Sequence, residues 1–380
     1  MTKSPEIRSS EHAGENSFFA LYVFTIAALV GAPSVGVLVT GLPVGPYLQF
    51  PPLTGYVHHA PFNPVIFAAG VLFSLFILLF LVYLCQGSLS QQRDGSSRVL
   101  LWWGWLGFVV VIVLWILAWN RFPWFSSLQP YTFTPLWLGY ILSVNGVTVK
   151  RSGTCLLTAD TRLFLLLFPV SAVFWWYFEW LNRFVQNWYY IGIENFSAHA
   201  YILHATLCFS TVLPAVISTC ELVGTVLPGP VINGPTVKYR CGKAGGWILL
   251  SAMAGVLVGL AVIPDFLFPF VWIAPLLFIT AIQCITGRQT CFSSLSVGNW
   301  RPVLLPALAA LICGFFWEMW NWKSLAHWEY SIPWVDRYHL FAMPILGYLG
   351  YLPFGLQCQL VTASVFDCSS QGCQLSDGGL

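Results

Sequence analysis

Charged residues are scarce in this chain of 380 residues. Asp, Glu, Lys and Arg make up 8% of it, about a third of the ~25% typical of soluble domains. A soluble globule with so few charges could not cover its surface, and hydrophobic residues make up 57%. The mean hydropathy of +0.74 and several apolar runs of roughly twenty residues instead predict a polytopic membrane protein.

Basic clusters and specific chemical motifs are also missing. The formal charge of +2 is spread without a basic block, which excludes nucleic acid as a partner. The residues before position 17 mix acids and bases and lack the apolar core and cleavage site of a signal peptide, so we expect a retained tail. No metal, nucleotide or nucleophile motif of high specificity occurs. The sequence therefore predicts no metal site and leaves any cofactor or protein partner unknown.

The apolar runs predict an all-α fold of about ten transmembrane helices, since a span needs roughly 17 to 25 apolar residues. Prolines inside these runs predict kinks, because neighbouring helices can satisfy the freed carbonyls in a membrane. The expected spans lie near residues 17–40, 64–85, 99–119, 131–148, 161–183, 200–223, 246–263, 265–284, 302–322 and 339–366.

Lysine and arginine fall mostly on one side of these spans. All but four lie in the N-terminal tail and the even-numbered loops, which places both termini in the cytoplasm by the positive-inside rule. The cysteines fall within helices or on that same side, which predicts reduced thiols rather than disulfides. A metal site at the close pair Cys368 and Cys373 is not expected. The four basic residues of the outer loops are Arg121, Arg183, Lys323 and Arg337.

Two segments of the chain repeat each other at an offset of about 135 to 140 residues. FEWLNRFVQNWYYIGI and WEMWNWKSLAHWEYSIP share Glu-x-x-Asn followed by Trp-x-Tyr. The match predicts two parallel four-helix repeats related by a pseudo-twofold axis along the membrane normal. The expected domains are 1–98 (tail and two unrepeated helices), 99–239 (first repeat) and 240–380 (second repeat and tail). The matching residues are Glu179, Asn182, Trp188 and Tyr190, then Glu318, Asn321, Trp328 and Tyr330.

These repeated residues form the candidate site at the predicted outer face. Acids near a bilayer are costly and are usually retained for chemistry or transport, so Glu179 and Glu318 are the candidate catalytic residues. The alternative is that they only reach headgroup water or an arginine. Arg183, four positions after Glu179, can pair with it, whereas Trp322 follows Glu318, so we expect Glu318 to be the more perturbed acid. The candidate substrate-binding residues are Asn182, Asn321, Trp188, Tyr190, Trp328, Tyr330, His58, His59, His199 and His339.

Histidines gather on the same predicted face. They lack the HxxxH or HxH spacing of a metal site, so ordinary interfacial hydrogen bonding is expected of them. The first outer loop, residues 41–64, is rich in proline and aromatic residues and predicts an ordered cap. We expect both repeated motifs to line one cavity beneath this cap, with His58 or His59 at its rim.

The pattern of Glu, then Asn, then Trp-x-Tyr resembles the membrane-embedded carotenoid cyclases of the heterodimeric or fused lycopene cyclase type. The resemblance covers about forty residues of each repeat, with Glu179 and Glu318 at the family's acidic position. It implies tandem helical repeats and an isoprenoid substrate. The family has paired acids after a proline, where this chain has Ala215 and Val216 after Pro214. The chain as a whole also resembles polytopic proteins of bacterial inner membranes.

Three classes of function fit these features. The first is a membrane enzyme acting on an isoprenoid or lipid, with Glu318 as general acid or base and aromatic rings stabilising positive charge. The second is a transporter or binding protein for a hydrophobic or protonatable solute. The third is a structural or assembly subunit of a membrane complex. A membrane lipid or isoprenoid is the expected partner of the first two.

Overall fold

The computed structural model describes residues 5–52, 55–89, 98–238 and 241–376, and within them the side chains of residues 23–365. Helices make up 71% of the chain, so the all-α prediction is confirmed. The main helices are α1 (Pro5–Thr40), α3 (Pro64–Leu89), α4 (Trp102–Trp119), α5 (Phe133–Ser152), α7 (Thr161–Val185), α8 (Ala198–Ser210), α9 (Val212–Val226), α10 (Lys243–Gly259), α12 (Ala274–Ile285), α13 (Arg301–Asn321) and α14 (Tyr351–Ser376).

Short elements connect these helices. The helical ones are α2 (Gly45–Leu48), η1 (Pro123–Phe125), η2 (Gln129–Tyr131), α6 (Leu156–Ala159), α11 (Pro264–Leu267), η3 (Phe268–Trp272), η4 (Ser293–Val297) and η5 (Ile345–Gly350). Four short strands form two antiparallel pairs, β1 (Trp188–Ile191) with β2 (His327–Tyr330), and β3 (His339–Leu340) with β4 (Met343–Pro344).

Among the described residues, six helices are long and apolar enough to cross a membrane, and the number is seven if one bent pair counts as a span. This fits an integral membrane protein. The six segments are Val23–Thr40, Pro64–Gly87, Trp102–Trp119, Thr161–Val185, Ala198–Val226 and Arg301–Asn321.

Three of the predicted helices differ from the observed ones. The run 200–223 is divided into α8 and α9 at Thr211, because Pro214 in the first turn of α9 has no backbone N–H to continue α8. The run 265–284 is bent by 59° before α12. The run 339–366 starts with β3, β4 and η5, so its helix begins only at Tyr351.

Helix α7 carries the first motif and ends where the site begins. Asp160 caps its N-terminus by accepting a hydrogen bond from the Leu163 amide over 2.9 Å. Gln186 follows its last residue in a left-handed conformation, with φ 50°. This turn reverses the chain and leads directly into β1.

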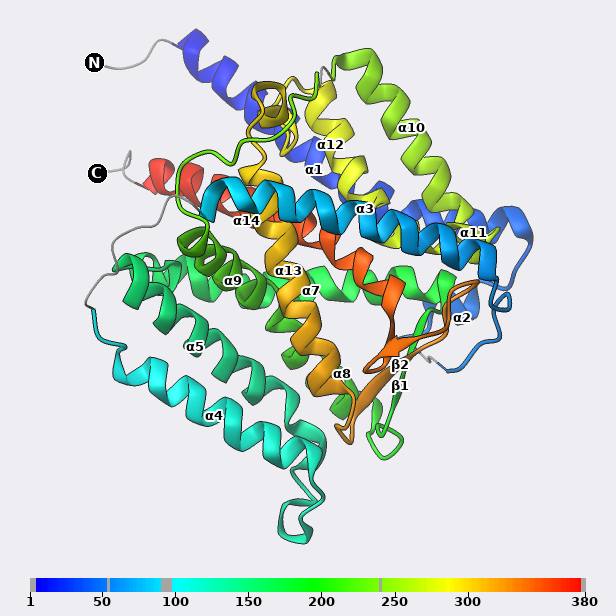
Figure 1. The fold of residues 1–380 in the computed structure, drawn as a ribbon. Helices are drawn as coiled ribbons and strands as arrows, with labels where there is room; N and C mark the ends of the chain where they lie inside the picture. The colour runs from blue at the N-terminus through cyan, green and yellow to red at the C-terminus, as the bar shows by residue number, and fades with distance from the viewer. Residues whose placement is uncertain (1–4, 53–54, 90–97, 239–240, 377–380) are drawn as a thin grey trace.

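The helices pack around a central group formed by α7, α9, α13 and α14 (Figure 1). The α4–α5 pair packs on one side of this group through α9, and α10 packs with α1 and α12 on the other. Helix α3 crosses the front of the bundle. The beginning of α1 and the end of α14 lie on the same side, opposite the β1–β2 pair (Figure 1).

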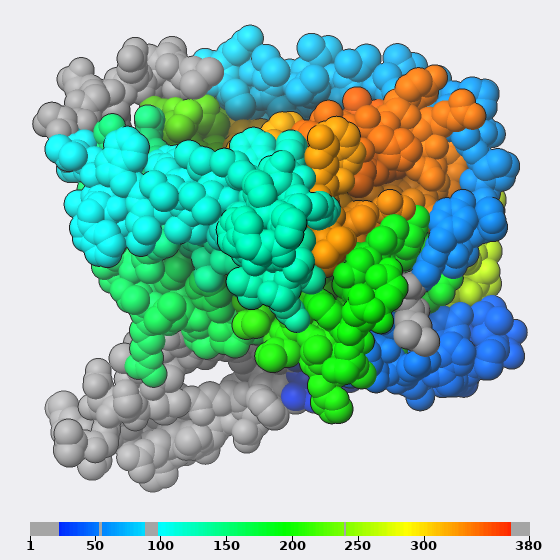
Figure 2. Space-filling model, turned by 90° about the horizontal axis from the view of Figure 1, so that it is seen from below, coloured from blue at the N-terminus to red at the C-terminus, as the bar shows by residue number. Residues whose placement is uncertain are grey.

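The two halves of the chain meet on the face seen in Figure 2. Chain from the first half, in green, lies there against chain from the second half, in orange. The β1–β2 pairing accounts for this contact, since one strand comes from each half.

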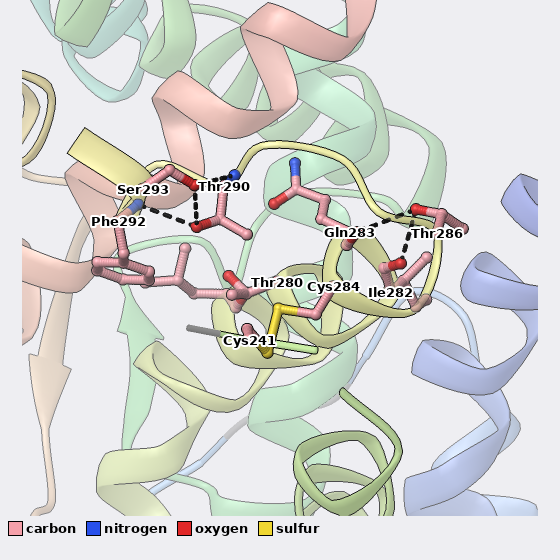
Figure 3. Close-up of a disulfide and its surroundings, with 10 residues drawn as sticks. Cys241, Thr280, Ile282, Gln283, Cys284, Thr286, Thr290, Phe292 and Ser293 are labelled. Atoms are coloured by element: carbon pink, nitrogen blue, oxygen red, sulfur yellow. Dashed lines mark hydrogen bonds between the residues drawn. A yellow bond between two sulfur atoms is a disulfide. The ribbon is translucent and has the colours of Figure 1, made fainter. Parts of the chain in front are cut away.

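One cysteine pair contradicts the prediction of reduced thiols. Cys241, just before α10, and Cys284, near the end of α12, form a disulfide with their Cα atoms 5.4 Å apart (Figure 3). The prediction was wrong because it considered only the cytoplasmic side on which the cysteines were expected. The disulfide depends instead on α10 and α12 packing side by side, which brings the two cysteines together. The side chains of Cys368 and Cys373 lie outside the described part of the chain.

Candidate aromatic–carboxylate site

The two Trp-x-Tyr motifs pair directly with each other as β1 and β2. In the antiparallel register Trp188 lies opposite Tyr330, and Tyr190 lies opposite Trp328. Alternate residues of a strand share a face, so these four aromatic side chains lie on one face of the two-stranded ribbon. Because corresponding residues exchange partners across the pair, the register has the form that a twofold axis would produce.

The two repeated asparagines hold the strands in place. Asn182 Nδ2 donates to the Trp188 carbonyl over 2.8 Å, and its Oδ1 accepts from the amide of Asn187 over 2.8 Å. Asn321 likewise donates to the Trp328 carbonyl over 2.7 Å and accepts from the Trp328 amide over 2.8 Å. Both side chains are buried. Their amides are therefore used by the backbone, which gives them a positioning role in the site.

Glu179 is fully buried and receives three hydrogen bonds on one oxygen. Its Oε1 accepts from Tyr190 OH over 2.6 Å, from Trp188 Nε1 over 3.0 Å and from Trp175 Nε1 over 3.2 Å. Trp175 comes from the preceding turn of α7, while the other two donors come from β1. The carboxyl group thus ties the ribbon to α7.

Glu318 has a related but different set of partners. Its Oε1 accepts from Tyr330 OH and from Tyr351 OH, each over 2.7 Å. Trp328 Nε1 donates to the Tyr330 hydroxyl over 2.7 Å, so it reaches the carboxyl group indirectly. Glu318 is also fully buried.

The two glutamates have different hydrogen-bond donors because the residue four positions before each of them differs. Trp175 lies four residues before Glu179, whereas Gly314 lies four residues before Glu318. A Cβ atom at Gly314 would overlap the ring of Tyr351. The glycine therefore leaves room for Tyr351 of α14, which supplies the second half with the donor that Trp175 gives to the first.

The phenols of the ribbon act as hydrogen donors. Burial raises the pKa of Tyr190 and that of Tyr330 well above the usual value, and the adjacent carboxyl group of Glu179 or Glu318 raises each further. Both hydroxyls therefore keep their protons at neutral pH. The Oε2 atoms of Glu179 and Glu318 are buried and accept no hydrogen bond from any described residue.

Arg183 does not pair with Glu179, which corrects the prediction. Its guanidinium donates to the backbone carbonyls of Tyr47, in α2, and Gln49, just after it, and it lies over the ring of Trp180. The i,i+4 spacing permits an ion pair, but the carboxyl group points to the ribbon and the guanidinium to the loop. Arg183 thus anchors the predicted cap.

A cavity of about 1040 Å³ lies beside the inner face of the ribbon. Its wall includes Trp188, Tyr190, Trp328 and Tyr330 from the ribbon, together with Trp175 and Tyr351. Among the described residues that line it there is no Asp, Glu, Lys or Arg. Glu179 and Glu318 lie behind this wall, and their hydrogen-bond donors separate them from the cavity.

Helix α3 forms one side of the cavity. Phe73, Phe76 and Ile77, in the middle of this helix, line the space. Near its ends the helix is fixed by Gly70, which lies against Leu346, and by the buried Leu84. A hydrophobic helix thus lines the cavity on that side.

The candidate histidines lie away from this cavity. His58 and His59 line a second pocket, of about 310 Å³. His59 Nδ1 lies 2.6 Å from Asp265 Oδ1, and its Nε2 lies 3.2 Å from the Gln186 carbonyl. His199, in the first turn of α8, is exposed.

His339 lies 2.9 Å from Asp336 at an exposed position. The histidines in the cavity wall are instead His204 and His327. In the described part of the chain, no group of three or more His, Cys, Asp or Glu residues could hold a metal ion.

Sequence reasoning missed three contributors to the site. Tyr351 was placed inside a helix expected to start at residue 339, and nothing in its spacing links it to Glu318. Trp175 is one of many aromatic residues in WWYFEW, although its i−4 position relative to Glu179 could have identified it. Gly314 matters only through the ring that occupies its space.

No family model matches the chain, and no similar curated protein or solved structure was found. The chemistry of the site is therefore inferred from its geometry. The arrangement offers a large apolar space, aromatic faces that can stabilise positive charge, and two buried carboxyl groups reached only through phenol and indole donors.

Proposed function

We propose that this protein is a membrane enzyme that takes an isoprenoid or other lipid into the apolar cavity. Glu318 acts on this lipid as a general acid or base, and Glu179 has the matching position in the other half of the chain. The observation that carries this proposal is the 1040 Å³ cavity without charged lining residues, walled by aromatic donors to the two carboxyl groups. Ligand pockets of this volume and mostly apolar lining suit a hydrophobic molecule.

The chemistry would use the tyrosines as intermediaries. The hydroxyls of Tyr330 and Tyr351 contact Glu318, and both residues line the cavity. A proton exchanged between Glu318 and a bound lipid would pass through one of them, and the rings of Trp328 and Trp188 could stabilise positive charge that develops on the lipid. The resemblance to the lycopene cyclase type agrees with an isoprenoid substrate.

The two parallel four-helix repeats belong to the same proposal. The exchange of partners between Trp188, Tyr190, Trp328 and Tyr330 supports a pseudo-twofold axis through the ribbon. The equivalent bonds of Asn182 and Asn321 support it independently. A site at the interface of two repeats is the usual arrangement in membrane proteins of this kind.

Binding without chemistry is the second candidate. It is favoured by the position of both carboxyl groups behind the aromatic wall, where they brace the ribbon. A binding protein or transporter would use the same cavity and would not need Glu318 to titrate.

Lipid extraction and mass spectrometry of the purified protein tests the proposal. We expect an isoprenoid or another lipid to copurify, and we expect Ala307→Trp to remove it, because Ala307 lines the cavity. Ala69→Trp on the exposed face of α3 is the control and should retain the lipid. An empty wild-type protein would contradict the proposal and favour an assembly subunit. If the lipid is present but neither wild type nor Glu318→Gln converts it, the binding function is the better one. Equal conversion by both would show that Glu318 is not the catalytic acid or base.

We also propose ten spans in a bacterial inner membrane with both termini in the cytoplasm. The Lys and Arg distribution and the common side of the α1 start and the α14 end support this topology. The basic residues Lys3, Arg93 and Arg240 that contribute to it lie outside the described residues.

Sided labelling of Cys241 tests the topology and the disulfide together. In a variant that keeps only Cys241 and Cys284, we expect a maleimide to label Cys241 only after reduction, and only from the cytoplasmic side. Labelling without reductant would show that the disulfide does not form. Labelling of intact cells by an impermeant maleimide, after reduction with an impermeant phosphine, would reverse the topology.

A further inference from the structure

One face of α3 lines the cavity along most of the helix. Its lining residues recur every three or four positions, the spacing of residues that share one face of a helix. Between the first and the last of them the helix advances roughly 21 Å. The cavity therefore extends beside α3 as an elongated space. The residues that mark its course are Gly70, Phe73, Ile77, Phe80 and Leu84.

The beginning of α3 lies on the side of the ribbon (Figure 1). There Gly70 lies against Leu346, which follows β4. Every described lining residue with a hydroxyl, imidazole or amide side chain belongs to the ribbon, to Asn187 just before it, to the first half of α8, or is Tyr351. None of these residues belongs to α3, α12 or α13. The polar atoms of a ligand therefore find their partners on the ribbon side.

The other end of the cavity is closed by packed apolar side chains. Leu84 and Leu304 are each 1% exposed and belong to a buried cluster with the end of α9, yet both also line the cavity. Trp300 packs against the same cluster and donates its Nε1 to the Pro235 carbonyl over 2.9 Å, so its polar atom is used within the protein. We call Leu84, Trp300 and Leu304 the floor. A hydrocarbon end fits against the floor, whereas a polar group there would lose its hydrogen bonds.

We propose that a lipid lies along α3 with its polar group at the ribbon, and that the floor sets the longest hydrocarbon chain that the cavity accepts. The inference rests on the proposed function, because it takes a lipid as the occupant. An extended chain advances about 3.5 Å over three bonds, so roughly 21 Å of helix corresponds to about 18 carbons. A longer chain would press on the packed side chains of the floor, and overpacking of this kind is unfavourable.

A series of straight-chain alcohols tests this limit on the full-length protein in detergent. The delipidated protein is incubated with an equimolar mixture from dodecanol to tetracosanol and purified again, and the retained alcohols are measured by gas chromatography and mass spectrometry. We expect retention to fall about tenfold between octadecanol and docosanol, within the usual cost of overpacking.

Variants of the floor assign the limit to its residues. Leu304→Ala removes part of the floor and should raise the retention of docosanol about tenfold. Leu305→Ala is the matched control, because Leu305 belongs to the same buried cluster but does not line the cavity. Val303→Trp adds volume at the same end of the cavity and should lower the retention of octadecanol about tenfold. If Leu304→Ala does not fold, the shift towards shorter chains in Val303→Trp still decides the question.

Photolabelling tests the direction in which the lipid lies. Hexadecanol that carries a diazirine on its last carbon should label peptides that contain Leu84 or Trp300. The same alcohol with the diazirine next to the hydroxyl should label residues 187–190 or 327–330. An exchange of these two patterns would overturn the proposed orientation.

The outcomes separate this inference from the proposed function. If no alcohol is retained, the proposed function fails and this inference with it. If alcohols are retained without a limit of length, or if Leu304→Ala and Val303→Trp leave the limit unchanged, the cavity binds lipid but the role of the floor is wrong. Phytol has the main-chain length of hexadecanol with added methyl branches. Stronger retention of phytol would identify an isoprenoid chain, and stronger retention of hexadecanol an unbranched one.

Discussion

Replacing Glu179 by leucine is expected to lower the free energy of unfolding by about 3 kcal/mol or more, because three buried or half-buried donors would lose their acceptor and each unsatisfied group costs at least about 1 kcal/mol. The donors are Trp175, Trp188 and Tyr190. Glu318→Leu should have a smaller effect, about 2 kcal/mol or more, because only the hydroxyls of Tyr330 and Tyr351 contact that carboxyl group directly. Thermal or SDS unfolding of the purified proteins in detergent measures both values.

Glutamine variants separate the hydrogen bonds from the charge. Glu179→Gln and Glu318→Gln keep an oxygen acceptor of the same size, so each should be far more stable than the leucine variant. Glu329→Leu is the surface control: Glu329 lies on the other face of the ribbon and is half exposed, and it accepts one bond from Tyr189 over 2.7 Å. Wild-type stability of Glu179→Leu would mean that its three donors find other acceptors and that this carboxyl group does not brace the ribbon.

For the ribbon of β1 and β2, the sequence predicts which residues correspond but not how they pair. The correspondence of Trp188 and Tyr190 with Trp328 and Tyr330 is visible as a repeat, and the structure brings all four residues together. Their pairing as strands was not predicted, because each strand has only four residues and is stabilised by its partner and by Asn182 or its counterpart rather than by a local pattern. A repeat identifies related residues but does not specify the contact between them.

The partners of the two acids could be predicted only in part. Glu179 and Arg183 are neighbours on a helix surface, and the spacing favours an ion pair. The carboxyl group instead points to the ribbon, while the backbone carbonyls of Tyr47 and Gln49, in and after α2, bind the guanidinium. Tyr351 reaches Glu318 only because α14 packs on α13. Contacts of this kind depend on the packing of distant segments, which local spacing does not reveal.

The contact between α13 and α14 gives the second large effect. A Cβ atom at Gly355 would overlap the carbonyl group of Pro306 and lie 2.9 Å from Cβ of Ala310, so any side chain there must force the two helices apart. We expect Gly355→Val to lower the free energy of unfolding by about 3 kcal/mol, at the upper end of the usual cost of overpacking. Tyr351 lies four residues earlier, on the same face of α14, so the displacement should also move its hydroxyl away from Glu318.

Gly255→Val is the matched control for this substitution. Gly255 lies in α10, and an added Cβ atom would meet no described atom within 4 Å, so the same change of residue type should cost only the small difference in helix propensity. Unfolding of both variants in detergent should separate them by more than 2 kcal/mol, on the order of the overpacking cost alone. If a lipid binds to wild type, Gly355→Val should also weaken its binding, whereas Gly255→Val should not. Equal stability of the two variants would mean that α14 can shift along α13 without loss, and the position of Tyr351 against Glu318 would then not be fixed by this contact.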